Sequence, residues 1–190
     1  LEAINEELNQ QQEELKAVND NLAEKNHEIG ESIDAALMVQ QAMLPHHEDF
    51  NKMFGQENYF ILYKPHQGKV SGDFYFMEEK RIKIKEAADK YRYENCLFFL
   101  CADCTGHGIP GALMTMLGNE LLHEIIQYLN IHEPAKILRR LHTEVRRTLH
   151  YKTSNMHNGM DLSVIVFYKA PQTKEGKFVV SKIEFAGAKS

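Results

Sequence analysis

The chain has 190 residues, of which 43% are hydrophobic and 26% are charged, which is enough for one folded domain with an appendage. Its formal net charge of −5, with no dense run of Lys and Arg, argues against a nucleic-acid-binding protein. The sequence shows no signal peptide and no apolar stretch long enough to cross a membrane, so we expect no membrane contact in this segment.

Residues 1–44 predict a long helix that forms a coiled coil and makes the chain a homodimer. Apolar residues recur every seven positions at heptad position a, whereas half of the side chains at position d are polar. A single amphipathic helix packed on its own domain is the alternative. The a positions are Leu1, Leu8, Leu15, Leu22, Ile29, Ala36 and Met43, and the d positions are Ile4, Gln11, Val18, Lys25, Ser32 and Val39.

After Gly30 the apolar spacing becomes that of a helix lying on a globular surface. The stripe has a period near 3.6 residues and consists of Ile33, Leu37, Gln40 or Gln41, and Leu44. Pro45 then ends the helix. We therefore expect residues 1–44 to contain a coiled-coil signalling helix and a switch helix, and residues 45–190 to form the globular part.

From Tyr59 onward, strand and helix patterns alternate in a way that predicts an α+β fold with antiparallel sheets. Leu113, Leu117, Leu121, Ile125 and Leu129 are expected to form the buried face of the first helix in this part. The predicted strands are 59–63 and 70–76, joined by a turn at 66–68, an extension and loop over 78–94, then 95–103, 162–168 and 178–185; the predicted helices are 108–130 and 134–150.

Two aspartates stand out because each lies in a segment that otherwise predicts a buried strand. Asp73 lies in "VSGDFY" (70–75), and Asp103 ends the apolar run 96–103, just before a glycine-rich turn. Strands are depleted in Asp, and a buried carboxylate needs a partner. A shared hard cation such as Mg²⁺ or Mn²⁺ is one explanation. The alternative is that each Asp caps a turn or a helix.

Three cysteines and a histidine raise the question of a zinc site. Cys96, Cys101, Cys104 and His107 are spaced C-x4-C-x2-C-x2-H, which matches no common closed zinc pattern. Cys96 and Cys101 lie in an apolar run, where we interpret them as small core residues. An odd number of free thiols is typical of a reducing compartment, so we expect a cytoplasmic location.

The motifs "VSGDFY" and "ADCTGHGIPGALMTMLG" (102–118) resemble the SpoIIE-like branch of the PPM (type-2C) metal-dependent serine/threonine protein phosphatases. The resemblance extends upstream to "SIDAALMVQQAMLP" (32–45) and downstream to "GMDLSVIVF" (159–167) and "EFAGAKS" (184–190), and so covers the chain from about Ile33 to its end. It implies a helix-flanked antiparallel β-sandwich of the PPM type, of which this chain holds the N-terminal portion.

The resemblance also implies a site for two divalent ions, Mn²⁺ or Mg²⁺. Asp103 would bridge both ions, the backbone carbonyl of Cys104 would ligate one, and Asp73 would bind directly or through water. The backbone amides of Gly106 and Gly108 open a helix and are candidates for binding a phosphate. His107 is a candidate general acid, or a residue that orients the loop, and Asp161 is interpreted as structural.

The implied function is dephosphorylation of phosphoserine or phosphothreonine on a regulatory protein, controlled through the dimeric N-terminal helix. The family's later acidic motifs do not occur before Ser190, so we expect a partial metal site and an incomplete sandwich. We also expect a parent chain with an upstream sensor domain, which can be attached to a membrane. The alternative is a coiled-coil dimerisation and phosphoprotein-binding module without catalysis; a phosphodiesterase would need compact histidine motifs that the sequence lacks.

Overall fold

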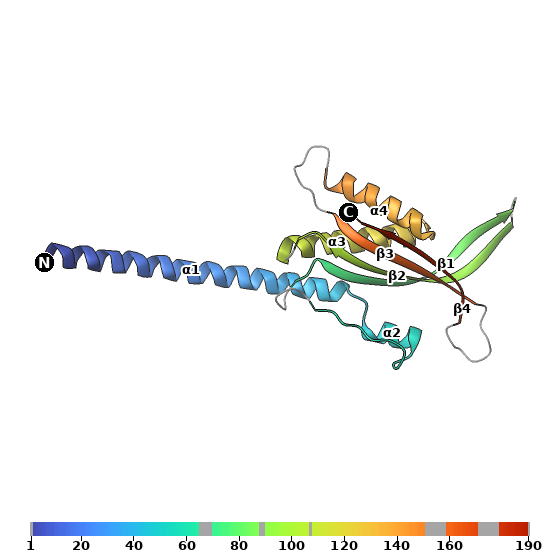
Figure 1. Ribbon diagram of the computed structural model, residues 1–190, viewed down its shortest axis with the longest axis horizontal. Helices are drawn as coiled ribbons and strands as arrows, with labels where there is room; N and C mark the ends of the chain where they lie inside the picture. Colours follow the sequence, from blue (N-terminus) through green and yellow to red (C-terminus); the bar gives the residue numbers. More distant parts are fainter. Residues whose placement is uncertain are drawn as a thin grey trace.

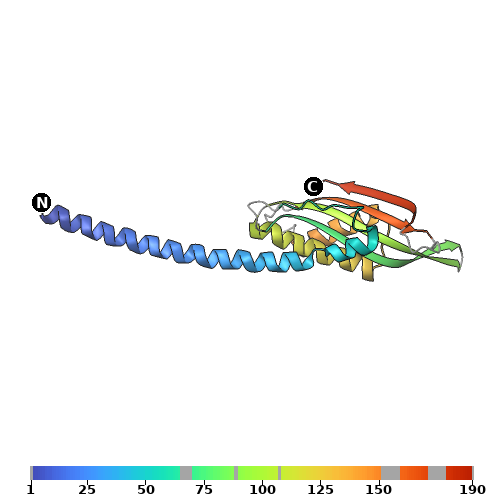
Figure 2. The same ribbon diagram turned by 90° about the horizontal axis from the view of Figure 1, so that it is seen from below.

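The computed structural model describes residues 2–64, 70–87, 90–106, 108–150, 159–170 and 179–189. A long N-terminal helix leads into a four-stranded antiparallel sheet with the order β1-β2-β3-β4. Helices α3 and α4 cover one face of this sheet (Figures 1 and 2). The predicted antiparallel α+β fold is confirmed. The elements are α1 (Glu2–Met43), α2 (His47–Phe54), β1 (Asp73–Ala87), β2 (Lys90–Cys104), α3 (Gly108–His123), the π-helix η2 (Glu124–Tyr128), α4 (Pro134–Thr148), β3 (Met160–Lys169) and β4 (Val180–Ala188).

The core lies between α3, α4 and the sheet face that they cover. Successive residues of a strand point to opposite faces, so the even-numbered residues of the central strands enter this core. Leu121, Leu122, Ile125, Ile137 and Leu141 complete it from the helices. The buried strand residues of this core are Phe74, Phe76, Ile82, Cys96, Phe98, Leu100, Ala102, Cys104, Leu162, Val164, Val166 and Tyr168.

Helix α1 runs without interruption through Gly30, and its first part projects away from the domain (Figure 1). The apolar side chains at the predicted heptad positions of this part are all more than half exposed: Ile4, Leu8, Leu15, Val18, Leu22 and Ile29. The second stripe behaves differently, because Gln40 is buried and Leu44 packs on the core. None of the described helices, α1 included, has the length and apolarity that crossing a bilayer requires.

The prediction for residues 45–76 is wrong in two places. Helix α2 was not predicted, and residues 59–63 form no strand. The Tyr59 ring stacks on Phe50 of α2, with 5.2 Å between centroids, and the Tyr63 hydroxyl donates a hydrogen bond to the Asp73 carbonyl. Aromatic packing on α2 and β1 therefore replaces strand pairing. The predicted turn at 66–68 lies outside the described residues.

The buried face of α3 is also shifted from the predicted one. Leu113 is 59% exposed and Leu129 is 40% exposed, although Leu121 and Ile125 are buried as expected. Small residues face the sheet instead: a methyl group at Gly118 would lie 3.1 Å from the Phe74 ring. Close packing of the helix on a large aromatic ring, rather than leucine periodicity, sets this face.

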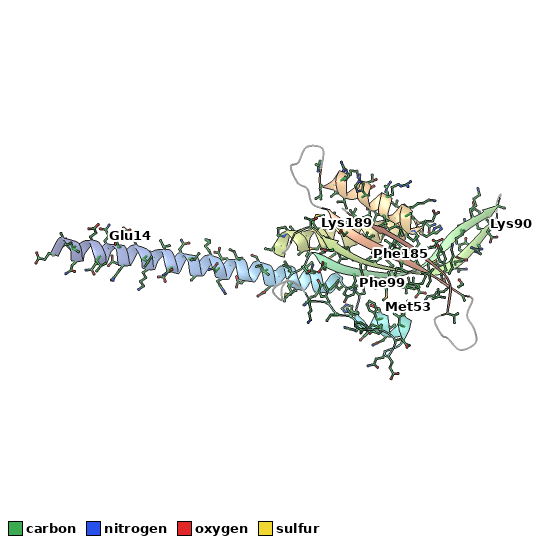
Figure 3. The ribbon with its side chains drawn as sticks, viewed as in Figure 1. Glu14, Met53, Lys90, Phe99, Phe185 and Lys189 are labelled. Atoms are coloured by element: carbon green, nitrogen blue, oxygen red, sulfur yellow. The ribbon has the colours of Figure 1, made fainter. Side chains whose placement is uncertain are left out.

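The sheet face opposite α3 and α4 is largely open. Phe185 and Ile183 of β4 are 66% and 58% exposed on this face, whereas α2 covers Phe99 in part through an edge-to-face contact with Phe50 (Figure 3). The described residues thus form one sheet of the expected sandwich, with α3 and α4 on one face and only the short helix α2 on part of the other.

Candidate metal and active site

Three aspartates lie side by side on the open face, at one end of the sheet. Asp73 of β1 is directly opposite Asp103 of β2, and Asp103 is directly opposite Asp161 of β3. All three line an open hollow of about 770 Å³, together with Tyr63 and Cys101 among others. The structure therefore brings together the two predicted carboxylates. It adds Asp161, which the sequence analysis interpreted as structural.

The Asp73 backbone is held on both sides. Its N–H donates to the Ser71 hydroxyl at 3.0 Å, and its carbonyl accepts the Tyr63 hydroxyl at 3.0 Å. Its side chain remains solvent-accessible, yet partial desolvation, followed by the negative charge and hydrogen bond of Asp103, raises the pKa of Asp73. Two carboxylates that share a proton and repel each other when ionised form an arrangement that a cation stabilises.

The turns that carry the two aspartates are in close backbone contact. The Cys104 N–H donates to the Gly72 carbonyl at 2.9 Å, and a methyl group at Gly72 would lie 2.5 Å from the Cys104 carbonyl oxygen. A methyl group at Gly111 would lie 2.6 Å from the Gly106 oxygen. Only glycine fits at these two positions, so the spacing between the β1 and β2 ends depends on them.

The loop from β2 to α3 contains the other predicted site residues. Gly106 and Gly108 have φ values of +101° and +66°, so glycine is required there by backbone conformation. Thr105 ties this loop to the start of β3 through its N–H to the Gly159 carbonyl at 2.9 Å, and its hydroxyl accepts the Gly159 N–H at 3.1 Å. His107, the candidate general acid, lies outside the described residues.

The cysteines divide between the two faces of β2. Cys96 and Cys104 are buried in the core, where burial raises the pKa of each thiol to about 12, so both are neutral thiols. Cys101 was predicted to be a core residue, and this is wrong: it is exposed and lines the hollow, because strand alternation turns it to the open face.

The structure reveals a contact from α1 that sequence reasoning found only in part. The Gln40 amide nitrogen donates to the Ser71 carbonyl at 2.6 Å and to the Thr115 hydroxyl at 2.9 Å, and its oxygen accepts the Ser71 N–H at 3.0 Å. The signal in the sequence was a polar residue within the apolar stripe, but the sequence did not decide whether Gln40 or Gln41 occupies that position. Gln40 reaches the residue whose hydroxyl holds Asp73.

Lys64 and Lys189 also line the hollow, and the sequence analysis missed both. Lys189 follows β4 at the rim of the open face (Figure 3). Exposed lysines carry no distinctive pattern, so only the strand order places them near the aspartates. They add positive charge beside three carboxylates, which suits a site that holds both a cation and an anion.

The donor set determines which metal would fit. Within the described ranges, no group of three or more His, Cys, Asp or Glu side chains is placed to hold one ion. Mg²⁺ commonly binds through one or two carboxylates and keeps several waters, and Mn²⁺ accepts similar oxygen ligands. Asp73 and Asp103 fit a hydrated ion of this kind. They do not form a closed cage.

Comparisons with known proteins agree with the fold described above. A family model described as "Stage II sporulation protein E (SpoIIE)" matches residues 93–183, which run from β2 into β4. The solved structure titled "SiaA-PP2C domain of Pseudomonas aeruginosa" is 26% identical with a TM-score of 0.56, covering 86% of this chain and 67% of that chain. None of the curated proteins matches.

A long helix leading into an antiparallel sheet with flanking helices is thus a PP2C-like α+β fold, the fold of a class of phosphatases. The family match over residues 93–183, together with this structural match, supports the narrower assignment to a SpoIIE-like PPM phosphatase fragment that the sequence motifs indicated.

Proposed function

We propose that this chain contributes to a metal-dependent phosphatase that removes phosphate from serine or threonine of a regulatory protein. The observation that supports this most directly is the cross-strand pair of Asp73 and Asp103, on the floor of an open hollow and in the family's two acidic motifs. The family match over residues 93–183 supports phosphoester hydrolysis, and the repulsion between the two carboxylates supports a bound cation.

The residues of this chain would divide the chemistry between them. Asp73 and Asp103, with the carbonyl of Cys104, would hold Mn²⁺ or Mg²⁺. Two such ions, when bound, supply a nucleophilic water and neutralise charge on the phosphoryl group. The amides of Gly106 and Gly108 at the start of α3 would orient the phosphate, since a helix N-terminus favours an anion. Lys64 and Lys189 would attract it, and His107 remains the candidate proton donor.

We further propose that α1 controls this site as a dimeric helix driven by an upstream sensor. Its exposed heptad positions suit a second copy, because a partner helix would cover them. Gln40 supports the connection to the site, since it binds both backbone groups of Ser71, two residues before Asp73. We place the domain in the cytoplasm, with any membrane attachment in a sensor elsewhere in the parent protein.

The test is Asp103→Asn, assayed with a phosphoserine peptide and Mn²⁺ in the 190-residue chain and in a chain extended beyond Ser190. Loss of a bridging ligand should lower turnover by at least about 10²-fold. Asp73→Asn should cost less and raise the Mn²⁺ requirement. Asp49→Asn, an exposed carboxylate on α2, is the matched control and should not change turnover. Near-normal activity of Asp103→Asn would refute the metal assignment.

The second candidate is a phosphoprotein-binding module without catalysis. It is favoured by the finding that the described residues offer two converging carboxylates and no three-ligand group. This candidate predicts binding of the phosphoserine peptide without phosphate release, whether or not Mn²⁺ is present. Phosphate release that depends on Asp103 would exclude it.

A further inference from the structure

The outer halves of β1 and β2 form a two-stranded arm that extends beyond the rest of the sheet. Strand β3 pairs with β2 only from Cys96 onward, so residues 90–95 of β2 pair with β1 alone. The arm projects from the domain at the end away from α1, and Lys90 marks its tip (Figures 1 and 3). A two-stranded ribbon is only marginally stable by itself, so we ask whether the surface of the arm serves another purpose.

Charges are sorted between the two faces of this arm. Arg81, Lys83 and Lys85 share one face and are exposed. The acidic residues Glu86 and Glu94 point to the opposite face, where Arg92 binds both, at 3.1 Å and 2.9 Å. Within the described part of the chain, none of the three cations on the first face forms an ion pair.

Two tyrosines complete the basic face. Tyr91 and Tyr93 lie opposite Lys85 and Lys83 and are 47% and 54% exposed. The Arg81 guanidinium lies 4.9 Å from the Tyr93 ring centroid, and the Lys83 ammonium lies 3.8 Å from that of Tyr91. Cation–π contacts hold these side chains against the ribbon. Arg and Tyr are also the residues that protein interfaces favour.

We propose that this basic face, formed by Arg81, Lys83, Lys85, Tyr91 and Tyr93, docks an acidic segment of the phosphoprotein substrate. This proposal rests on the proposed function. The basic face and the aspartate pair lie on the same side of the sheet, because all these residues are odd-numbered in β1 and β2. At a rise of about 3.3 Å per residue, Arg81 and Lys85 lie roughly 26 Å and 40 Å along β1 from Asp73.

The charge pattern favours a short acidic protein segment over other polyanions. The chain carries a net charge of −5, and three aspartates and Glu79 share this side of the sheet, so a long nucleic acid or a flat anionic membrane meets repulsion beyond the arm. Lysines on an edge strand also prevent sheet-to-sheet aggregation. That role does not depend on the sign of the charge, whereas docking does.

The first experiment measures binding of a fluorescein-labelled Glu-rich peptide to the 190-residue chain by anisotropy at low salt. Lys83→Glu with Lys85→Glu should weaken binding about tenfold, because each reversal replaces attraction by repulsion. Lys16→Glu with Arg139→Glu gives the same change in net charge at exposed cations elsewhere and should change binding less than about twofold. Equal loss in both variants, or tighter arm-dependent binding to single-stranded DNA or phosphatidylglycerol vesicles, would overturn the proposal.

The second experiment separates this proposal from the proposed function. Phosphoserine peptides carrying a Glu tract about eight to twelve residues from the phosphate, the spacing between the arm and Asp73, are compared with peptides lacking the tract. The arm reversal should raise KM only for peptides with the tract and leave kcat and p-nitrophenyl phosphate hydrolysis unchanged. If the arm reversal leaves KM unchanged for peptides with the tract while turnover depends on Asp103, the docking proposal is refuted and the proposed phosphatase function stands. If peptide binding depends on the arm but no turnover is observed, the proposed phosphatase function is refuted and the docking proposal stands.

Discussion

Gln40→Met tests whether α1 is structurally connected to the aspartate-bearing turn. Methionine has a similar length and remains compatible with a helix, but it removes all three hydrogen bonds of the Gln40 amide. Ser71 is 4% exposed, so its N–H and carbonyl then lose the partners that Gln40 supplies without gaining water. An unsatisfied buried group costs about 1–3 kcal/mol, which gives an expected loss of roughly 2–6 kcal/mol for the two groups together. The Thr115 hydroxyl keeps its bond to the Ala112 carbonyl and adds little.

Urea unfolding of the 190-residue chain measures this loss, and amide hydrogen exchange reports where it acts. Gln41→Met is the matched control, since Gln41 is the exposed neighbour, and it should change stability by less than about 0.5 kcal/mol. Exchange should accelerate at the Ser71 amide in the Gln40 variant only. If the free energy of unfolding of Gln40→Met lies within about 0.5 kcal/mol of wild type and exchange at the Ser71 amide is unchanged, the Gln40 contact does not hold the turn.

Three further results are expected. Desolvation and Asp103 raise the pKa of Asp73 above its ordinary 3.8, so ionisation of Asp73 lowers the stability of the folded state as pH rises through that raised pKa. Asp73→Asn should therefore raise the unfolding midpoint of the metal-free chain at about pH 7 but not at about pH 3. An equal effect at both pH values would contradict this. Leu15→Lys with Leu22→Lys should convert a dimer to a monomer in sedimentation, whereas a wild-type chain that is monomeric at tens of micromolar would contradict the coiled coil. Thiol reagents should label Cys101 first, and Cys101→Ser should remove that phase, since Cys96 and Cys104 are buried. Stoichiometric zinc that is lost on replacing Cys96 and Cys101 would contradict the conclusion that these thiols bind no metal.

The carboxylate pair was predictable because its signal is local. Asp73 and Asp103 each interrupt an apolar strand beside glycines, and the antiparallel pairing that joins them needs only one hairpin. Asp161 and Lys189 could not be placed in the same way, because strand register between distant segments is set by packing that no single segment encodes. The structure adds them to the site only through the order β1-β2-β3-β4.

The errors in the fold have the same origin. Residues 59–63 alternate as a strand does, yet the Tyr59 ring stacks on Phe50 of a helix that the sequence did not reveal. Leu113 was assigned to the core on hydrophobicity, but Gly118 provides the close approach to Phe74 and turns Leu113 outward. Tertiary packing overrode local preference in both cases. The long helix α1 was correctly predicted since its pattern is long and strongly periodic.

The turn at Ser71 and Gly72 connects three parts of the molecule. Gln40 of α1 binds the Ser71 backbone, the Ser71 hydroxyl holds the Asp73 N–H, and Gly72 contacts the Cys104 carbonyl next to Asp103. A displacement of α1 that breaks the Gln40 bonds therefore changes the support of both carboxylates. If dimerisation of α1 alters cation affinity by some factor, linkage requires the cation to alter dimer affinity by the same factor. In the proposed mechanism, control through α1 and control by the metal would then be two descriptions of one coupling, and the Gln40–Ser71 hydrogen bonds are the contact through which we propose that it passes.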